Sequence, residues 1–227
     1  MTSLNDQIKP HTKPQLSLWY LGQVSVTTKQ VTFRPWIAVG KICLRLIVFG
    51  AVCALLWAGY LRMTGNVHTI EEGQAYRSAQ LSANALLKLI GDKKIRTVIN
   101  LRGYNGGKNW YDAEIEATHK AGITHVDLAL SANRKLSDQQ LSRLSDILIK
   151  SPKPILIHCE GGADRAGLAA AMYELIVAGR SALVAGTQLS FRFGHFPWLG
   201  SRTVAMDQTW DHFLVSSIKN ENHQEKR

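Results

Sequence analysis

Cysteine and acidic residues are both scarce in this sequence of 227 residues. Only three cysteines are present, and Cys159 is the one that lies outside a long apolar run. A lone cysteine in the rest of the chain excludes a disulfide framework. Acidic residues number 17 against 27 lysines and arginines, so the formal net charge is +10. Apolar residues make up 45% and charged residues 19%, which favours a packed core over disorder.

The basic excess is concentrated early in the chain. Residues 1–41 contain many lysines and arginines but the single acid Asp6. No motif of a nucleic-acid-binding domain accompanies this charge, so a nucleic-acid partner is not expected. Residues 1–41 are therefore interpreted as a solvated tail that stays in the cytoplasm. The remaining chain has a modest basic excess, which would suit an anionic substrate.

Residues 42–61 form a continuous apolar run, ICLRLIVFGAVCALLWAGYL. About 20 residues is the length of a helix that crosses a hydrocarbon core of about 30 Å. Arg45 is close enough to one end to reach the surface, and Trp57 and Tyr60 are placed for the far interface. A buried helix of a soluble protein is disfavoured by the continuity of the run. A cleaved signal peptide is disfavoured by the long polar stretch before it.

The charges beside this run predict its orientation. The positive-inside rule places the basic N-terminal side in the cytoplasm. Residues 62–73 would then be a linker, residues 74–215 a domain beyond the membrane, and residues 216–227 a C-terminal tail. In a bacterium, this topology puts the domain in the periplasm and the protein in the inner membrane as a single-pass chain.

Strand and helix patterns alternate after residue 74. Strands are predicted at 76–77, 97–101, 125–130 and 155–158, and helices at 82–90, 110–121, 137–150, 165–178, 181–189 and 207–218. Ser137 and Gln140 form a capping box at one helix start. His195, Phe196 and Trp198 are expected to pack against the C-terminal helices. The alternation predicts an α/β domain with a mostly parallel central sheet flanked by helices.

One run combines several residues suited to binding an anion. After strand 155–158, the chain reads His158, Cys159, Glu160, Gly161, Gly162, Ala163, Asp164, Arg165, and an apolar helix follows. Amides of residues 160–165 would point at one spot and form an anion site, which the two glycines allow the backbone to approach. Arg165 offers a planar fork that matches two phosphate oxygens. Cys159 stands where these dipoles would stabilise a thiolate nucleophile.

This H-C-x5-R pattern resembles the protein tyrosine phosphatase superfamily, especially dual-specificity and related bacterial phosphatases. Residues 76–80 (YRSAQ), 98–102 (VINLR) and 188–195 (QLSFRFGH) are also similar to segments of bacterial members, so the resemblance covers about 74–214. A structural cysteine and a rhodanese-like sulfur-transfer loop are the alternatives. His158 and the six-residue offset from Cys159 to Arg165 favour the phosphatase.

The resemblance implies a two-step mechanism that needs no metal or cofactor. The Cys159 thiolate would attack phosphorus while Arg165 and the loop amides hold the oxygens, and water would hydrolyse the cysteinyl-phosphate. His158 would order the loop, Glu160 would lie at its rim, and Arg102 would add a second anion contact. The substrate class stays open between a phosphorylated protein and a phosphorylated lipid.

Two positions depart from the family pattern. Ala166 stands where the family usually has Ser or Thr, which predicts slower turnover and keeps a weak or inactive phosphate-binding module as the alternative function. No acid occurs in residues 128–135, where related phosphatases carry their general acid. Asp164 is the first candidate for this role, by likeness to a Gly-x-Asp-Arg loop, and Asp127 is the second. Asp138 is explained by its place at a helix start.

Overall fold

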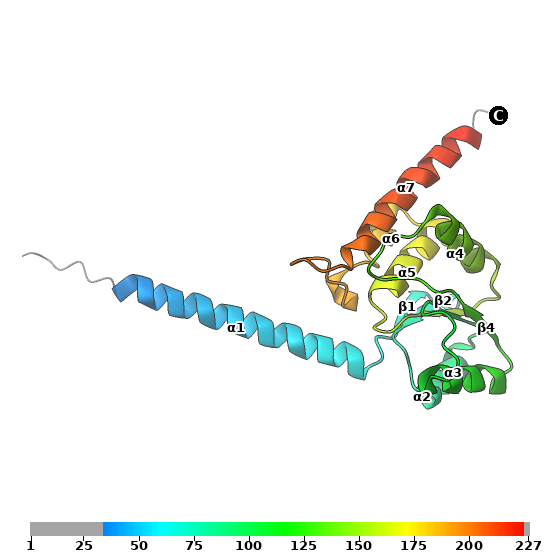
Figure 1. The fold of residues 1–227 in the computed structure, drawn as a ribbon, viewed down its shortest axis with the longest axis horizontal. Coiled ribbons are helices and arrows are strands. Elements are labelled where there is room, and N and C mark those ends of the chain that lie inside the picture. Colours follow the sequence, from blue (N-terminus) through cyan, green and yellow to red (C-terminus); the bar gives the residue numbers. More distant parts are fainter. Residues whose placement is uncertain (1–33, 225–227) are drawn as a thin grey trace, which may run out of the picture. The chain divides into compact units, whose positions relative to one another are not determined.

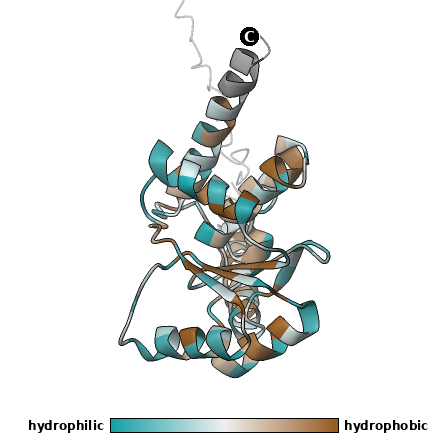
Figure 2. Cartoon of the chain, turned by 90° about the vertical axis from the view of Figure 1, so that its right-hand side faces the viewer, coloured by the Kyte–Doolittle hydropathy of each residue, from teal (hydrophilic) through white to brown (hydrophobic). Residues whose placement is uncertain are grey.

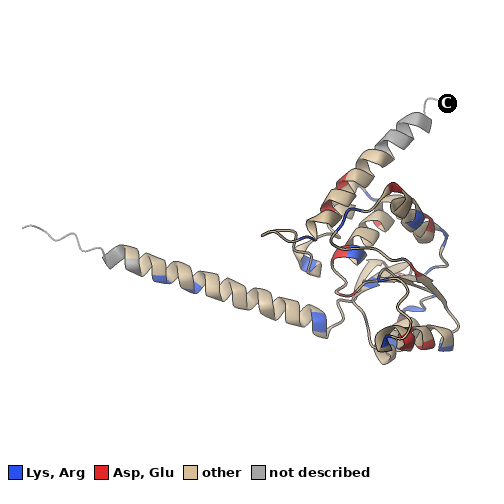
Figure 3. Cartoon of the chain, viewed as in Figure 1, with Lys and Arg blue, Asp and Glu red and all other residues tan. Residues whose placement is uncertain are grey.

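The computed structural model describes residues 34–224, and the predicted tail over 1–41 lies mostly outside them. The chain divides into two compact units, residues 1–48 and residues 49–227. Helix α1 (Arg34–Met63) contains the predicted apolar run. It is long and apolar enough to cross a membrane, because Ala38–Met63 holds an 18-residue window with a mean hydropathy of 2.2 and none of that window is buried. Figure 3 shows α1 almost free of charged residues over most of its length.

A five-stranded sheet forms the centre of the second unit (Figure 1). Its strands are β1 (His68–Glu71), β2 (Ala75–Ser78), β3 (Thr97–Asn100), β4 (Thr124–Asp127) and β5 (Ile155–His158). Their spatial order is β1-β2-β5-β3-β4, and only β1 runs antiparallel to its neighbour. The predicted mostly parallel sheet is confirmed. Because β5 is the central strand of the sheet, the loop that follows it begins at the centre of the edge where the parallel strands end.

Helices cover both faces of this sheet (Figures 1 and 2). On one face lie α2 (Ala83–Lys93) and α3 (Asn109–Lys120), and on the other lie α4 (Asp138–Lys150), α5 (Asp164–Ile176), α6 (Ala182–Gly186) and α7 (Val204–Gln224). Side chains of β5 alternate between the faces, so Ile155 and Ile157 pack toward α5 while Leu156 packs toward α2. Figure 2 shows the resulting hydrophobic layer along the strands.

The predicted helices and strands are present with shifted ends, and α7 continues to Gln224, through most of the predicted tail 216–227. The capping box of Ser137 and Gln140 starts α4 as expected. Strand β4 stops at Asp127 instead of continuing to residue 130, and α5 begins one residue earlier than predicted, at Asp164. Shifts of one to three residues are expected when element ends are predicted from sequence, because hydrophobic periodicity gives no sharp limit there.

The stretch 62–73, predicted as a linker, is built into the domain. It contains β1, whose only buried residue is Ile70, and such a short edge strand carries little sequence signal. Asn66 is 1% exposed and has a φ of 47°, so it fixes a tight turn inside the domain. The backbone of Gly65 accepts a hydrogen bond of 2.8 Å from Ala79, which ties this turn to the end of β2.

The expectation for residues 195–198 is partly wrong. His195 is buried, at 1% exposed, but Phe196 and Trp198 are 41% and 55% exposed and do not join the core. They belong to an extended stretch between the short 3-10 helix η2 (Phe191–Phe193) and α7. We call η2 together with the residues that follow it, up to Arg202, the 191–202 segment.

Candidate active site

The predicted strand, loop and helix around Cys159 are all present. Cys159 directly follows β5 and is 2% exposed, and α5 begins five residues later. Gly162 has a φ of +70°, and a Cβ there would come within 2.6 Å of the Ala79 nitrogen. Glycine is therefore required at this position by both conformation and close approach. A Cβ on Gly161 would meet no neighbouring atom, so glycine is not required at this position. The expectation that both glycines are needed is therefore wrong for Gly161.

Four consecutive carbonyl groups of the loop are held by donors from other parts of the domain. Gln80 N donates to Glu160 O (3.1 Å), Asn66 Nδ2 to Gly161 O (2.9 Å), and Arg77 Nη2 to Gly162 O (2.7 Å) and Ala163 O (3.0 Å). Within residues 34–224, the amides of residues 160–163 donate to no protein acceptor. A loop that turns its carbonyls outward and keeps its amides free, next to a helix N-terminus, can bind an anion.

Arg77 is the main support of this loop. Its side chain is fully buried, and its guanidinium lies 4.2 Å from the centre of the Phe193 ring. Its Nη1 donates to the backbone and side-chain oxygens of Gln188 at 2.7 and 2.8 Å. Burial lowers the pKa of Arg77 to about 10, so it remains a cation at neutral pH. Arg77 therefore joins the loop to residues 188–193, two of the stretches that resemble bacterial phosphatases.

Arg165 lies in the first turn of α5 and uses only part of its guanidinium for protein contacts. Its Nη1 donates weakly to Leu101 O and Leu130 O, at 3.4 and 3.3 Å. Within the described residues, its Nε and Nη2 donate to no acceptor. The Nε–Nη2 edge of a guanidinium is the one that can bind two phosphate oxygens side by side.

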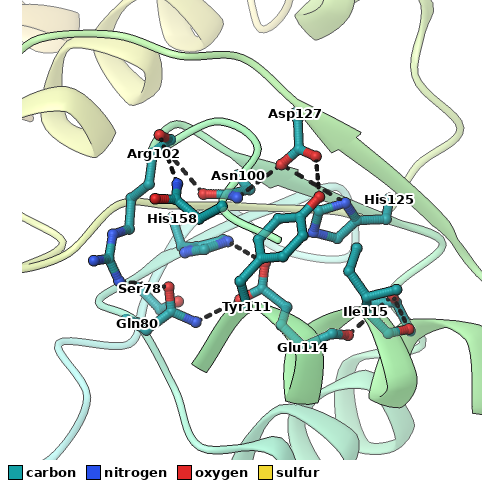
Figure 4. A network of polar contacts seen from close by, with 12 residues as sticks. Ser78, Gln80, Asn100, Arg102, Tyr111, Glu114, Ile115, His125, Asp127 and His158 are labelled. Atoms are coloured by element: carbon teal, nitrogen blue, oxygen red, sulfur yellow. Dashed lines mark hydrogen bonds and ion pairs between the residues drawn. The ribbon is translucent and has the colours of Figure 1, made fainter. Parts of the chain in front are cut away.

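His158 belongs to a buried polar network that sequence reasoning missed (Figure 4). Its Nε2 lies 3.0 Å from Oε1 of Glu114 on α3, and the same oxygen lies 2.8 Å from Nε2 of His125. Gln80 donates to the other oxygen. Burial alone would raise the pKa of Glu114, but these hydrogen bonds lower it to about 2. The carboxylate therefore stays ionised and holds His158 in place at the end of β5.

Arg102 and Asp127, two predicted site residues, make different contacts (Figure 4). Arg102 stacks on the Trp110 ring at 3.6 Å and donates to Gln80 Oε1 at 3.2 Å. Asp127 has both oxygens engaged, one by Asn100 Nδ2 at 2.8 Å and one by the Tyr111 hydroxyl. Its carboxyl group is therefore committed to anchoring the ends of β3 and β4.

Asp164 pairs with a histidine that sequence reasoning assigned to packing. Asp164 Oδ1 lies 2.7 Å from His195 Nδ1, and His195 Nε2 lies 3.0 Å from Asp207 Oδ2 on α7. Burial opposes a charged imidazole, but the two carboxylates outweigh it and raise the pKa of His195. The only sequence signal for this role was the inclusion of His195 in the stretch that resembles bacterial phosphatases.

A cavity of about 730 Å³ opens beside the loop. Its lining joins loop residues to residues from four other segments: Ala58, Leu61, Arg62, Asn66, Ala79, Gln80, Arg102, Trp110, Glu160, Gly161, Ala163, Asp164, Phe193 and Gly194. Asp164 and Arg102 are thus brought to one cavity, whereas Asp127 is not part of its wall. The last turns of α1 supply one side of the cavity.

Similarity to known proteins covers most of this domain. Residues 73–180 match the model of a family described as "Polymorphic toxin system, DSP-PTPase phosphatase". No curated protein matches the sequence. Similar solved structures include TpbA of P. aeruginosa (21% identity, TM-score 0.49, 67% of this chain and 91% of that one) and the catalytic core of Siw14 from S. cerevisiae (18%, 0.50, 70% and 93%). Tk-PTP is 16% identical with a TM-score of 0.50, over 66% of this chain and 97% of that one.

Residues 73–180 thus match a family of dual-specificity-like protein tyrosine phosphatases, and the domain has a fold similar to that of the Siw14 catalytic core.

Proposed function

We propose that this chain is a membrane-anchored, cysteine-dependent phosphatase that removes phosphate from a lipid head group. The observation that carries the enzymatic part is the loop between Cys159 and Arg165, whose carbonyls are tied outward and whose amides are left for an anion. Such a nest of donors stabilises the charge on a phosphoryl group in the transition state. The same loop carries both the sulfur and the guanidinium that the reaction needs.

In the first step, the Cys159 thiolate forms a bond to phosphorus as the ester P–O bond breaks. Asp164 shares a proton with His195 and donates that proton to the leaving oxygen, while Arg165 with the loop amides holds the non-bridging oxygens. In the second step, water gives a proton to Asp164 and its oxygen bonds to phosphorus as the S–P bond breaks. Inorganic phosphate leaves, and the thiolate and the protonated Asp164 are both restored.

The wall of the cavity favours a lipid substrate. Ala58, Leu61 and Arg62 of α1 lie in that wall, beside loop residues. In this proposal, α1 spans a bacterial inner membrane with the N-terminus in the cytoplasm and the domain in the periplasm. A head-group phosphate at the membrane surface would then reach the loop without leaving its bilayer, and Arg62 and Arg102 would attract its charge.

Phosphate release by the full-length protein in lipid nanodiscs tests the proposal. The substrates are a phosphatidic acid or a phosphoinositide in the bilayer and a soluble phosphotyrosine peptide, each at equal phosphate concentration. We expect faster release from the lipid and none from either substrate with Cys159→Ser. Unchanged release in Cys159→Ser would contradict the enzymatic role. A preference for the peptide would instead contradict only the lipid assignment.

A phosphate-binding module without turnover is the second candidate, and Ala166 favours it because the residue offers no hydroxyl to the sulfur. Binding of inorganic vanadate or phosphate without any release of phosphate from either substrate would support this function. The topology is checked separately with a reporter fused after Arg227 that is active only in the periplasm. An inactive periplasmic reporter, together with activity of a cytoplasm-specific reporter fused at the same position, would reverse the proposed orientation.

A further inference from the structure

The 191–202 segment exposes four large apolar side chains. Phe191, Phe196, Trp198 and Leu199 are 43%, 41%, 55% and 94% exposed. The Phe196 ring contacts those of Phe191 and Trp198 edge to face, at 6.4 and 5.1 Å between centres, so the aromatic side chains form one continuous row. Contiguous apolar surface of this kind marks a contact with another molecule or with a membrane.

The tip of this row is held outward by the backbone. Leu199 has a φ of +56° and is followed by Gly200 at +78°, so the chain turns sharply at this point. A bulky residue other than glycine rarely adopts a positive φ, because its Cβ crowds the backbone. Here the strained turn presents a leucine whose side chain contacts almost nothing within the domain.

The row is attached to the end of α1. Trp57 Nε1 donates to the carbonyl of Phe191 at 3.2 Å, and Asn66 Nδ2 donates to the carbonyl of Phe193 at 2.8 Å. Trp57 lies six residues before the last residue of α1, Met63 (63 − 57), which is about 9 Å along a helix. If α1 spans a membrane, the backbone of Phe191 therefore lies at the depth of its far interface.

The charges and residue types of the 191–202 segment and of the end of α1 fit an anionic lipid surface. The 191–202 segment contains Arg192 and Arg202 and no acidic residue, and Arg62 lies at the end of α1. The rings of Trp57 and Tyr60 stack at 5.5 Å on the same end of the helix. Tryptophan and tyrosine gather at membrane interfaces, and arginines beside them are attracted to anionic head groups.

We propose that the 191–202 segment is a bilayer-contacting surface, with the aromatic row and Leu199 inserted among the head groups and upper acyl chains. Its occupant is the anionic membrane that α1 crosses, so this inference rests on the proposed span but not on the proposed hydrolysis. Phe193 and Gly194 of the same segment line the cavity beside the loop. Contact between this segment and lipid would hold the mouth of the cavity at the membrane surface.

Fluorescence from single labelled cysteines in the full-length protein tests this surface. The background is Cys43→Ser, Cys53→Ser and Cys159→Ser, and Leu199→Cys carries a nitrobenzoxadiazole label in vesicles of phosphatidylcholine and phosphatidylglycerol. Brominated acyl chains are expected to remove about half of its emission, because interfacial groups insert to a depth of about 5–10 Å. The matched control is Leu183→Cys on α6, which is 86% exposed but lies outside the segment and should keep its emission.

The native Cys53, labelled with the other two cysteines replaced, reports on α1 itself. Quenching at Cys53 together with quenching at Leu199→Cys and none at Leu183→Cys supports the proposal. Quenching at Cys53 without quenching at Leu199→Cys overturns the surface alone. No quenching at Cys53 overturns the span and the surface together. A blue shift of the label at Leu199→Cys without quenching by bromine would show that protein, such as a second copy of the chain, covers this position. That result would overturn the proposal that lipid covers it.

Discussion

Two histidine clusters lie at opposite ends of the loop between Cys159 and Arg165, and their charges are arranged in opposite ways. Before the loop, the carboxylate of Glu114 lies between two imidazoles, those of His125 and His158. After the loop, the imidazole of His195 lies between two carboxylates, those of Asp164 and Asp207. The first arrangement lowers the pKa of its central acid and the second raises the pKa of its central base.

Their exposure separates their roles. The Glu114 and His158 side chains are each 3% exposed, whereas those of Asp164 and Asp207 are 25% and 36% exposed. A sealed cluster with a fixed charge can orient a backbone but cannot exchange protons with a substrate. The cluster that reaches the cavity through Asp164 can do so. We therefore expect the first cluster to control stability and the second to control turnover.

Asp164→Asn is expected to give the largest effect. Loss of a general acid lowers kcat by about 10²–10⁴-fold. The loss should be greatest for an alkyl phosphate and smaller for nitrophenyl phosphate, whose leaving group needs little protonation. Steady-state kinetics on both substrates provide the measurement. Asp207→Asn is the matched control, since it removes the other partner of His195 from outside the cavity wall. Equal losses in the two variants would contradict the role of Asp164.

Glu114→Gln is expected to lower stability more than turnover. A pKa lowered from 4.5 to about 2 corresponds to about 3 kcal/mol of stabilisation at pH 7. This contribution is present above pH 4.5 and is lost as the pH falls toward 2. Unfolding of the purified protein in detergent should therefore show a gap between parent and variant that narrows below pH 4.5. A gap that stays constant with pH would show that the carboxylate charge has no such role.

His195→Gln should produce an intermediate loss of turnover and the opposite pH dependence. Without the imidazole, Asp164 loses its positioning partner, and we expect kcat to fall by about tenfold, less than for removal of the acid itself. The raised pKa of His195 adds stability that is fully present below pH 6.5 and is lost as the pH rises through the folded-state pKa. The gap in unfolding temperature should therefore close on the alkaline side, where the Glu114→Gln gap remains. If the stability differences of Glu114→Gln and His195→Gln both disappear at acidic pH, or both at alkaline pH, the two clusters do not have opposite charge arrangements.

Ala166→Ser is expected to give the smallest change, a gain of a few-fold in turnover. Within the described residues, neither cluster donates a hydrogen bond to the Cys159 sulfur. A serine hydroxyl at this position would supply one, as the family resemblance implies, and would speed breakdown of the cysteinyl-phosphate. Rapid-quench kinetics should show a smaller burst and a faster steady state. Unchanged steady-state turnover in this variant would show that Ala166 does not limit hydrolysis of the cysteinyl-phosphate.

Local patterns in the sequence were sufficient for the strand, the loop and the helices. The apolar run of β5, the glycines after Cys159 and the capping box of α4 act over a few residues, so each is visible in a short window. Arg165 follows from the same window because it lies on the same loop and helix start, whereas Asp164 was named through the family resemblance. The structure places Asp164 and Arg102 in the wall of one cavity, whereas Cys159 and Arg165 are not among the residues that line it.

The missed residues act through contacts between distant parts of the chain. Glu114 looks like a surface acid of an amphipathic helix, and only packing of α3 against the sheet turns it toward His158, 44 residues away. His195 meets Asp164 across 31 residues. Asn66 depends on a left-handed turn beside an edge strand with a single buried residue. Periodicity and composition carry no information about such pairings.

The hydrogen bond from Asn66 to the Gly161 carbonyl also has a practical consequence. The domain cannot be separated cleanly at the end of α1, because Asn66, in the turn after that helix, donates a hydrogen bond that holds the loop between Cys159 and Arg165. A soluble fragment trimmed to residue 73, where the family match begins, would lack Asn66 and β1. It would leave one loop carbonyl without its donor and expose the open edge of β2. Low activity in such a fragment would reflect the cut and not the enzyme.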